Sequence, residues 1–326
     1  MIHCMAARHW RRRALACSLG LMLGLSACSP EGRTDGVAAE KANPIHRTDR
    51  FQAVTRTGDL MVAVGAFGVV ATSTDGGSHW LRTVLPDAPA LIDVAACGDG
   101  SLAALDFSGR IWRADGAAKE WTALAVPATD ALLAATCTAD NRLWAVGARG
   151  AIFTSADGGK TWDDKSLPED IQLLNIAFPT ATSGVISGEF GRVLLTGDGG
   201  ANWSEGGSLG ADFYPLAMHF PDPEHGLVVG IAGAFLETSD GGKSWTRSKA
   251  PTEAPLYGVL ARPAGGAIAV GAGGTAFTLE GGQWRALEGI PKTDLRGIAA
   301  SPAALVLAGS GVLVPVPATV AKASAN

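Results

Sequence analysis

Short apolar runs recur along most of the chain, separated by glycine, proline and polar residues. One unit holds the apolar runs 132–137, 143–147 and 151–154, followed by a shorter run at 161–163 that contains a tryptophan. Runs of this length bounded by turn residues predict strands, and the absence of long helical periodicity argues against a parallel α/β sheet. Each unit therefore predicts four short strands.

The unit repeats about every 41 residues, which is typical of a propeller blade. The second run of each unit gives the blade count, and these runs lie at 60–64, 102–105, 143–146, 184–187, 227–229, 267–270 and 305–308. The sequence predicts an all-β fold, a single seven-bladed β-propeller of four-stranded blades, with six blades as the alternative. The last unit ends after 312–316 without an outermost strand, and we expect residues 44–48 to complete that blade and hide its edge.

An Asp-Gly-Gly turn followed by a tryptophan marks four units, and two degenerate copies end at Trp121 and Trp284. Successive tryptophans are 41, 41, 41, 42 and 39 residues apart. An aspartate can accept backbone hydrogen bonds, glycines permit positive φ, and a tryptophan can pack into the blade. We therefore expect a structural role, with a metal or ligand site as the alternative, for Asp75, Trp80, Asp115, Trp121, Asp157, Trp162, Asp198, Trp203, Asp240, Trp245 and Trp284.

These segments resemble the Asp-box, or BNR repeat, of sialidase-type propellers, where it forms the turn between the third and fourth strands. The unit 144–162 further resembles the repeat of the photosystem II stability/assembly factor family, and copies beginning at Val62, Val185 and Val228 extend the resemblance over nearly the whole mature chain. The resemblance implies a seven-bladed propeller that binds unassembled membrane protein. The family's basic patch is not carried over, because the position of Arg149 is Phe67, Ser108, Phe190 and Ala232 in other units.

A partner-binding face is predicted where the loops between second and third strands meet the connections between blades. The residues expected there are Phe67, Asp106, Phe107, Arg149, Glu189, Phe190, Tyr214, Tyr257 and Arg296. Exposed aromatic and arginine side chains are enriched in binding hot spots, although any one of these could instead pack between blades. We expect a membrane or envelope protein as partner, a monomer, and no cofactor.

A glycoside hydrolase or carbohydrate-binding propeller is the alternative function, because sialidases use Asp-box propellers. Their chemistry commonly needs a tyrosine with a glutamate, an aspartate and three arginines. The mature chain has two tyrosines, Tyr214 and Tyr257, and no Arg-Ile-Pro segment like that of sialidases. The histidines that remain after export, His46, His79, His219 and His225, are scattered and are expected at surface or turn positions, so no enzyme or metal site is predicted.

The first 27 residues predict an export signal, with four arginines before an apolar run from Ala14 to Leu25. The segment Leu25-Ser-Ala-Cys28 resembles a bacterial lipobox, which implies lipidation of Cys28. Residues 28–43 then form a flexible tether, 44–318 the propeller and 319–326 a C-terminal tail. The expected location is the cell envelope, on the periplasmic side of the outer membrane if the cell is Gram-negative.

The net charge of the mature chain limits the class of partner. The signal holds four of the 26 basic residues and none of the 31 acidic residues, so its removal changes the net charge from −5 to −9. Nucleic acid is excluded as a partner, since a duplex requires a basic stripe.

Cys97 and Cys137 end the first strands of neighbouring blades, and they form either a disulfide or two buried thiols.

Overall fold

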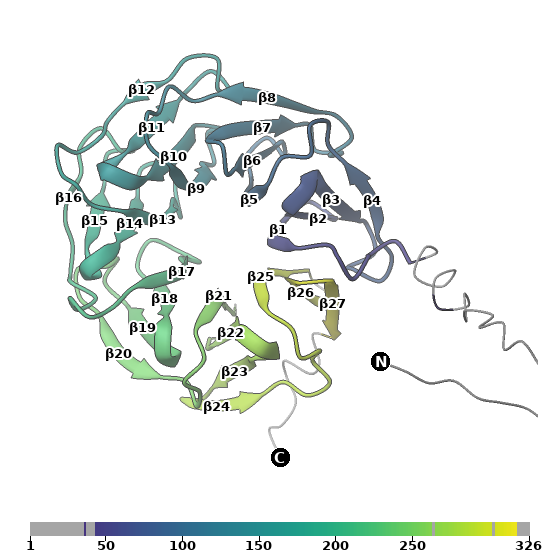
Figure 1. Ribbon diagram of the computed structural model, residues 1–326. Coiled ribbons are helices and arrows are strands. Elements are labelled where there is room, and N and C mark those ends of the chain that lie inside the picture. Colours follow the sequence, from purple (N-terminus) through teal and green to yellow (C-terminus); the bar gives the residue numbers. More distant parts are fainter. Residues whose placement is uncertain (1–35, 37–42, 263–264, 302–303, 318–326) are drawn as a thin grey trace, which may run out of the picture.

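The computed structural model describes residues 36, 43–262, 265–301 and 304–317, and these residues form a ring of seven antiparallel sheets around a central opening (Figure 1). The prediction of a seven-bladed propeller is confirmed, and the six-bladed alternative is wrong. The predicted signal, nearly all of the tether including Cys28, and the tail lie outside the described residues. No helix among the described residues has the length and apolar character needed to span a membrane.

The seven blades, numbered in chain order, are built from consecutive strands. Blades 1 to 3 contain β1 (Phe51–Thr57), β2 (Leu60–Gly65), β3 (Val69–Ser73), β4 (Leu81–Val84); β5 (Leu91–Ala96), β6 (Leu102–Asp106), β7 (Arg110–Ala114), β8 (Trp121–Ala125); and β9 (Leu132–Cys137), β10 (Leu143–Gly147), β11 (Ile152–Ser155), β12 (Asp163–Asp164). Blades 4 and 5 contain β13 (Leu173–Ala177), β14 (Gly184–Gly188), β15 (Val193–Thr196), β16 (Ser204–Glu205); and β17 (Pro215–His219), β18 (Gly226–Gly230), β19 (Ala234–Thr238), β20 (Thr246–Lys249). Blades 6 and 7 contain β21 (Leu256–Ala261), β22 (Ala267–Gly271), β23 (Ala276–Glu280), β24 (Gln283–Ala286); and β25 (Leu295–Ala300), β26 (Ala304–Gly309), β27 (Val312–Pro317).

The core lies between neighbouring blades, because each sheet presents apolar side chains on both faces. Leu105 and Ile111 of blade 2 form one buried cluster with Leu143 and Phe153 of blade 3, and Trp162 packs against it. Second strands are buried along their length, as in β10 and β18, which explains why they read as continuous apolar runs. This packing fixes each blade against the next and holds the loops at both ends of the ring.

Blade 7 has three strands among the described residues, and the expectation that residues 44–48 supply a fourth is wrong. Instead, Arg50 forms a single bridge with Ser310, and the Gly311 N–H donates to the Asp49 carbonyl at 2.7 Å. Proline lacks an N–H, so Pro315 cannot donate from β27, which suits an edge strand rather than a central one. The ring still closes, since Phe51 of β1 shares a buried cluster with Val306 of β26.

Hydrogen bonds between loops show which loops lie together on each of the two faces of the ring. The Asp-box turns bond the turns between first and second strands, as where the Gly241 N–H donates to the Glu224 carbonyl at 2.8 Å. The turns between second and third strands bond the connections between blades, as where the Gly68 N–H donates to the Pro89 carbonyl at 2.6 Å. We call these the Asp-box face and the connection face.

Candidate partner-binding face

Five turns on the connection face share one backbone shape: η1 (Ala66–Gly68), η2 (Ala148–Gly150), η3 (Glu189–Gly191), η4 (Ile231–Gly233) and η5 (Ala272–Gly274). The middle residue of each is left-handed, with φ of 59° at Phe67, 56° at Arg149, 58° at Phe190, 53° at Ala232 and 64° at Gly273. Glycine adopts this conformation freely, whereas a bulky residue there is strained. Four of the five blades therefore keep a side chain at a strained, projecting position.

Three phenylalanines on this face are strongly exposed. Phe67 and Phe190 are each 68% exposed, and Phe107, in the turn between β6 and β7, is 75% exposed. Arg149 occupies the equivalent place in blade 3, where its Nε lies 3.7 Å from Asp130 Oδ1 across exposed surface. The structure thus brings these four predicted side chains to the tips of blades 1 to 4.

Asp106 requires a correction, because it is 1% exposed and cannot meet a partner. Its Oδ1 accepts the backbone N–H groups of Ser108 and Arg110, and its Oδ2 accepts Arg110 Nε at 2.7 Å and Trp112 Nε1 at 2.8 Å. The carboxylate instead holds the turn that presents Phe107.

Glu189 and Tyr214 meet around one glutamine. Glu189 Oε1 accepts the Gln172 N–H at 2.9 Å, and Tyr214 Oη donates to Gln172 Oε1 at 3.4 Å. Burial, and to a lesser degree the charge of Glu189, raise the pKa of the Tyr214 hydroxyl. This cluster braces the base of the Phe190 turn.

A ring of bulged residues lines the mouth of the channel, and it includes Tyr257 and Arg296. In every first strand the register to the second strand skips the second residue, which is a β-bulge, so that these positions are Gln52, Ile92, Leu133, Leu174, Leu216, Tyr257 and Arg296. Bulges redirect a side chain, and all seven are half-buried and line the channel. The Arg296 guanidinium lies over the Tyr257 ring at 4.6 Å.

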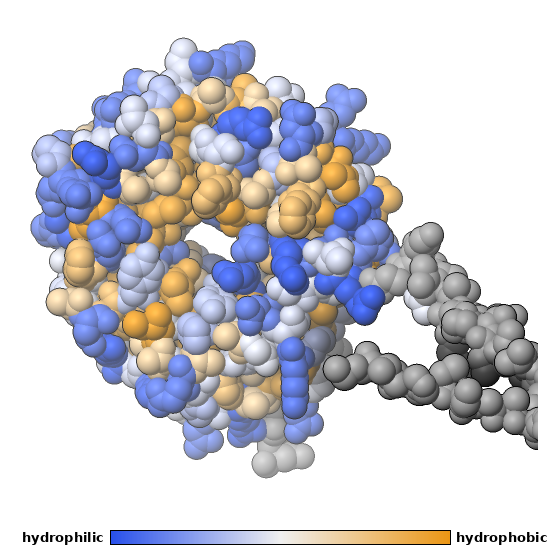
Figure 2. Space-filling model, in the orientation of Figure 1, coloured by the Kyte–Doolittle hydropathy of each residue, from blue (hydrophilic) through white to orange (hydrophobic). Residues whose placement is uncertain are grey.

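The sequence prediction found only Tyr257 and Arg296 of this ring, although the regular spacing of the seven positions was a signal that could have revealed the others. The ring is apolar from blade 2 to blade 5 and polar at blades 7 and 1. In the view of Figure 2, apolar surface gathers along the upper rim of the opening and hydrophilic surface along its right side. The mouth is therefore asymmetric despite the symmetry of the fold.

Below the mouth, the channel encloses about 490 Å³. Three polar groups in it link neighbouring first strands: Asp93 Oδ2 accepts the Ala135 N–H at 3.0 Å, His219 Nδ1 accepts the Ala261 N–H at 3.1 Å, and Asn175 Nδ2 donates to the Pro215 carbonyl at 3.5 Å. His219 corrects the expectation of a surface or turn position, because it lies in β17 and burial lowers its pKa to about 4. Burial likewise raises the pKa of the Asp93 carboxyl.

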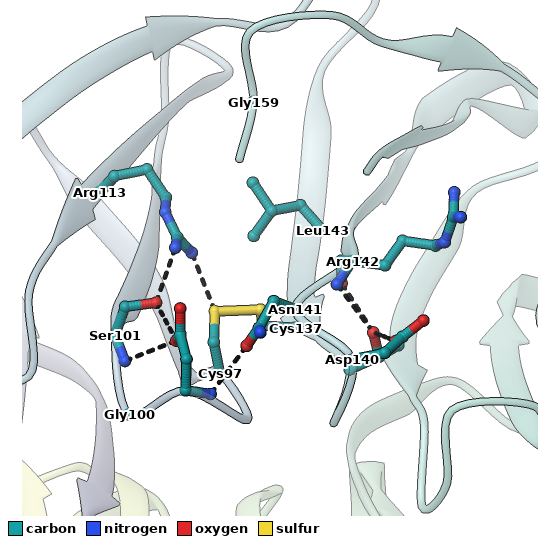
Figure 3. The surroundings of a disulfide bond; sticks show 12 residues. Cys97, Gly100, Ser101, Arg113, Cys137, Asp140, Asn141, Arg142, Leu143 and Gly159 are labelled. Atoms are coloured by element: carbon teal, nitrogen blue, oxygen red, sulfur yellow. Dashed lines mark hydrogen bonds between the residues drawn. A yellow bond between two sulfur atoms is a disulfide. The ribbon is translucent and has the colours of Figure 1, made fainter. Parts of the chain in front are cut away.

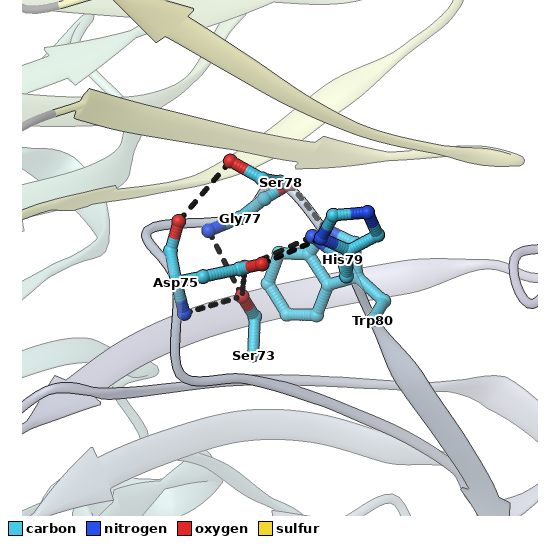
Figure 4. A network of polar contacts seen from close by, with 6 residues as sticks. All are labelled: Ser73, Asp75, Gly77, Ser78, His79 and Trp80. Atoms are coloured by element: carbon cyan, nitrogen blue, oxygen red, sulfur yellow. Dashed lines mark hydrogen bonds and ion pairs between the residues drawn. The ribbon is translucent and has the colours of Figure 1, made fainter.

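The Asp-box turn of blade 1 has a satisfied polar network (Figure 4). Asp75 Oδ1 accepts the His79 N–H at 2.9 Å and Ser73 Oγ at 2.8 Å, while Trp80 Nε1 donates to the Gly77 carbonyl at 2.9 Å. Hydrogen bonds from His79 and Ser73 hold the pKa of the Asp75 carboxyl well below its usual range. The groups that could bind a ligand are already occupied within the turn.

The other intact copies repeat the aspartate bonds of this network, whereas the indole N–H groups of Trp162, Trp203 and Trp245 are buried without a hydrogen-bond partner. The degenerate copies depart from the aspartate bonds as well. In blade 2, the Asp115 carboxylate accepts one hydrogen bond from the described residues, from the Ala117 N–H at 3.1 Å. In blade 6, a two-residue turn at Gly281 and Gly282 replaces the Asp-box before Trp284. All six tryptophans are half-buried. Within the described residues, no three His, Cys, Asp or Glu side chains come together to hold a metal ion.

Cys97 and Cys137 form a disulfide, with Cα atoms 4.9 Å apart, that joins the first strands of blades 2 and 3 (Figure 3). Of the two alternatives left by the sequence, the structure has the bridge. Arg113 of β7 donates to Cys97 Sγ at 2.9 Å and to Ser101 Oγ at 2.7 Å. The disulfide covalently links blades 2 and 3 beside the turns between first and second strands, far from the connection face.

Comparisons with known proteins agree with this geometry. A sequence profile of the family described as Photosynthesis system II assembly factor YCF48 matches residues 117–208 and 207–260, less than half of the chain. The chain is a propeller similar to the YCF48 assembly factors. No curated protein matches its sequence.

Solved structures extend the likeness of the fold. YCF48 from Cyanidioschyzon merolae is 16% identical with a TM-score of 0.66, covering 83% of this chain and 96% of its own. YCF48 bound to D1 peptide is 23% identical with a TM-score of 0.55, covering 68% of this chain and 74% of its own. Virginiamycin B lyase from Staphylococcus aureus is 13% identical with a TM-score of 0.71, covering 81% and 93%. At these identities the superpositions establish the propeller fold alone.

Proposed function

We propose that this protein is an exported, membrane-anchored binding factor that holds a segment of a membrane or envelope protein on its connection face during assembly or stabilisation of a complex. The observation that carries the proposal is the exposure of Phe67, Phe107 and Phe190 around Arg149 on one face. Aromatic and arginine side chains in such a cluster are typical of binding hot spots. The similarity to YCF48, one structure of which holds a D1 peptide, supports a polypeptide ligand.

Anchoring forms the second part of the proposal. The lipobox-like segment ending at Cys28 would place acyl chains at the start of a tether to residue 43. Each buried CH₂ contributes about 0.8 kcal/mol to membrane attachment. A tethered propeller would then meet its partner at the membrane surface, on the periplasmic side of the outer membrane in a Gram-negative cell.

Glycoside hydrolysis is the competing function and is less well supported. The Asp-box carboxylates are engaged within their own turns, and the channel groups Asp93 and His219 bond neighbouring strands. The likeness to virginiamycin B lyase extends to the fold alone. Binding without turnover therefore fits the described residues best.

The test compares wild type with the double variant Arg149→Glu and Phe190→Ala in capture of membrane proteins from the native host, followed by mass spectrometry. The variant should keep its thermal midpoint and weaken binding at least about 30-fold, because two hot-spot residues are removed. Both proteins are also incubated with fluorogenic sialosides and other glycosides. Equal capture by both proteins contradicts the assigned face, and glycoside turnover that the variant lacks would establish the competing function.

A further inference from the structure

The tips of blades 1 and 4 keep phenylalanine where the backbone favours glycine. Phe67 and Phe190 have φ of 59° and 58°, and the equivalent tip of blade 6 carries Gly273 in the same conformation. Glycine thus fits this turn, and a left-handed bulky residue costs stability. Since both rings are also largely exposed, neither strain nor exposure is compensated within the described residues. Such a combination indicates that the rings are held for contact with another molecule.

An apolar surface continues from these tips towards the channel. The bulged residues of blades 2 to 5 are Ile92, Leu133, Leu174 and Leu216, and their side chains line the mouth inside the tips. On the outer side, Ile231 of η4 is 46% exposed. Two largely apolar rows therefore follow the same arc of the ring, the outer one interrupted by Arg149 at the tip of blade 3, and this shape suits an extended or helical apolar segment.

Carboxylates accompany the aromatic tips. Asp87 lies in the connection between blades 1 and 2, between the tips that bear Phe67 and Phe107, and it is exposed. Asp170 precedes blade 4 and Glu189 is the neighbour of Phe190. No ion pair with a lysine or arginine of the described residues is formed by Asp87, Asp170 or Glu189. Opposite charge on the partner would complete these sites.

We propose that the connection face binds an apolar polypeptide segment flanked by lysine or arginine residues, with Phe67, Phe107 and Phe190 as anchors. This inference rests on the proposed function and specifies the chemistry of the partner. Carboxylates beside the anchors disfavour an anionic lipid surface, and a net charge of −9 on the mature chain disfavours a second copy. The apolar arc receives the segment, and Asp87, Asp170 and Glu189 receive its flanking cations.

The first experiment measures binding of fluorescent peptides to the purified mature protein by anisotropy. The probes are a leucine- and valine-rich peptide with lysines at both ends, the same peptide with glutamates at both ends, and a serine- and glycine-rich peptide with lysines at both ends. The lysine-flanked apolar peptide should bind at least about 10-fold tighter than either control. Equal affinity for the first two peptides, or for the first and third, overturns the proposal.

Variants distinguish a loss of peptide binding from a loss of folding stability. Phe67→Gly with Phe190→Gly should weaken binding of the lysine-flanked apolar peptide at least about 30-fold, while the thermal midpoint stays equal to or above that of wild type because strain is relieved. Ala232→Gly is the matched control, since it relieves the same strain in η4 without removing a ring, and it should bind normally. Normal binding by the double glycine variant overturns the proposal.

Two further measurements decide between occupants. Flotation with phosphatidylcholine and phosphatidylglycerol vesicles uses the unlipidated mature protein, and sedimentation velocity measures self-association. Vesicle binding or dimerisation that is lost in the double glycine variant would assign the rings to lipid or to a second copy and overturn the proposal. If membrane proteins are still captured through Arg149 and Phe190 while the lysine-flanked peptide fails to bind, the proposed function stands and this inference alone is wrong.

Discussion

At the residue scale, the Asp-box aspartates show why one pattern recurs from blade to blade. Asp157 Oδ1 accepts the N–H groups of Lys160 and Thr161 and Ser155 Oγ, so a single side chain closes the turn. Hydrogen bonds from Asn202 and Ser244 lower the pKa of Asp198 and Asp240 to about 2. These pKa values are depressed on folding, so their contribution to stability is present above pH 4 and is lost as the pH falls towards 2.

Trp162→Ala tests the structural role of the repeat tryptophan. The ring is half-buried and packs against the cluster of Leu143 and Phe153, so its loss should lower the free energy of unfolding by roughly 2–3 kcal/mol, less than for a fully buried tryptophan. Chemical denaturation provides the measurement. An unchanged free energy of unfolding would mean that the tryptophan contributes no packing, and would reopen the Asp-box as a ligand site.

His219→Asn tests the buried imidazole in the channel. Burial lowers the histidine pKa from 6.5 to about 4, so the unfolded chain binds a proton that the folded protein does not, and stability falls as the pH drops through this window. The loss is up to about 3 kcal/mol. An asparagine oxygen can still accept the Ala261 N–H without titrating. Thermal midpoints from pH 7 to pH 4 should therefore fall more steeply for wild type, and parallel curves would contradict this assignment.

Local sequence patterns predicted exposed side chains better than buried polar ones. Phe67 and Phe190 stand beside a glycine in a turn between two apolar runs, which sufficed to place them at a tip. Asp106 also stands at a turn between two apolar runs, but it is buried because the side chains of Arg110 and Trp112 fold back onto it and donate to its carboxylate. His219 was missed because its partner Ala261 lies in the next blade.

At the element scale, the strands were predictable and the edge of the ring was not. All seven second strands lie where the apolar runs predicted them, because a strand that is buried on both faces is a continuous run of apolar residues. Among the described residues blade 7 has no fourth strand, because residues 43–50 pair with it through a single bridge, between Arg50 and Ser310. A repeat pattern does not encode the path of these residues. The bulge in each first strand was also hidden, because it changes pairing without changing composition.

The bridge between β5 and β9 can be tested by replacing Cys97 and Cys137 with serine. The disulfide closes a segment with a sequence separation of 40, so its removal should lower the free energy of unfolding by about 4 kcal/mol. Mass spectrometry after alkylation without reductant first establishes that the wild-type thiols are blocked. Equal thermal midpoints for the oxidised wild type and the serine variant would contradict a stabilising role.

At the scale of the whole molecule, repetition and variation have different consequences. The blades share their antiparallel strands, and four of them share intact Asp-box turns, whereas the tips carry Phe67, Phe107, Arg149, Phe190 and Ala232 in turn. A single asymmetric partner requires such variation. The sequence therefore predicted this face and its aromatic and arginine tips, whereas most of the bulged residues inside the tips were found only in the structure.

Anchoring also belongs to this scale. Cys28→Ala should abolish incorporation of a fatty-acid probe during growth, because it removes the sulfur at the end of the lipobox-like segment. The protein should then be found in the soluble fraction of the envelope or remain unprocessed. Labelling of the variant equal to that of wild type would contradict the proposed lipid anchor.

The central claim is that a partner protein binds the connection face, and site-specific photo-crosslinking in the native host tests it most directly. A photoreactive phenylalanine replaces Phe107 on the connection face, or His79 in the exposed part of an Asp-box turn as the matched control. We predict that irradiation joins the first protein to a membrane or envelope protein and leaves the second uncoupled. Crosslinks from position 79 with none from position 107 would contradict the account and move the binding site to the Asp-box face.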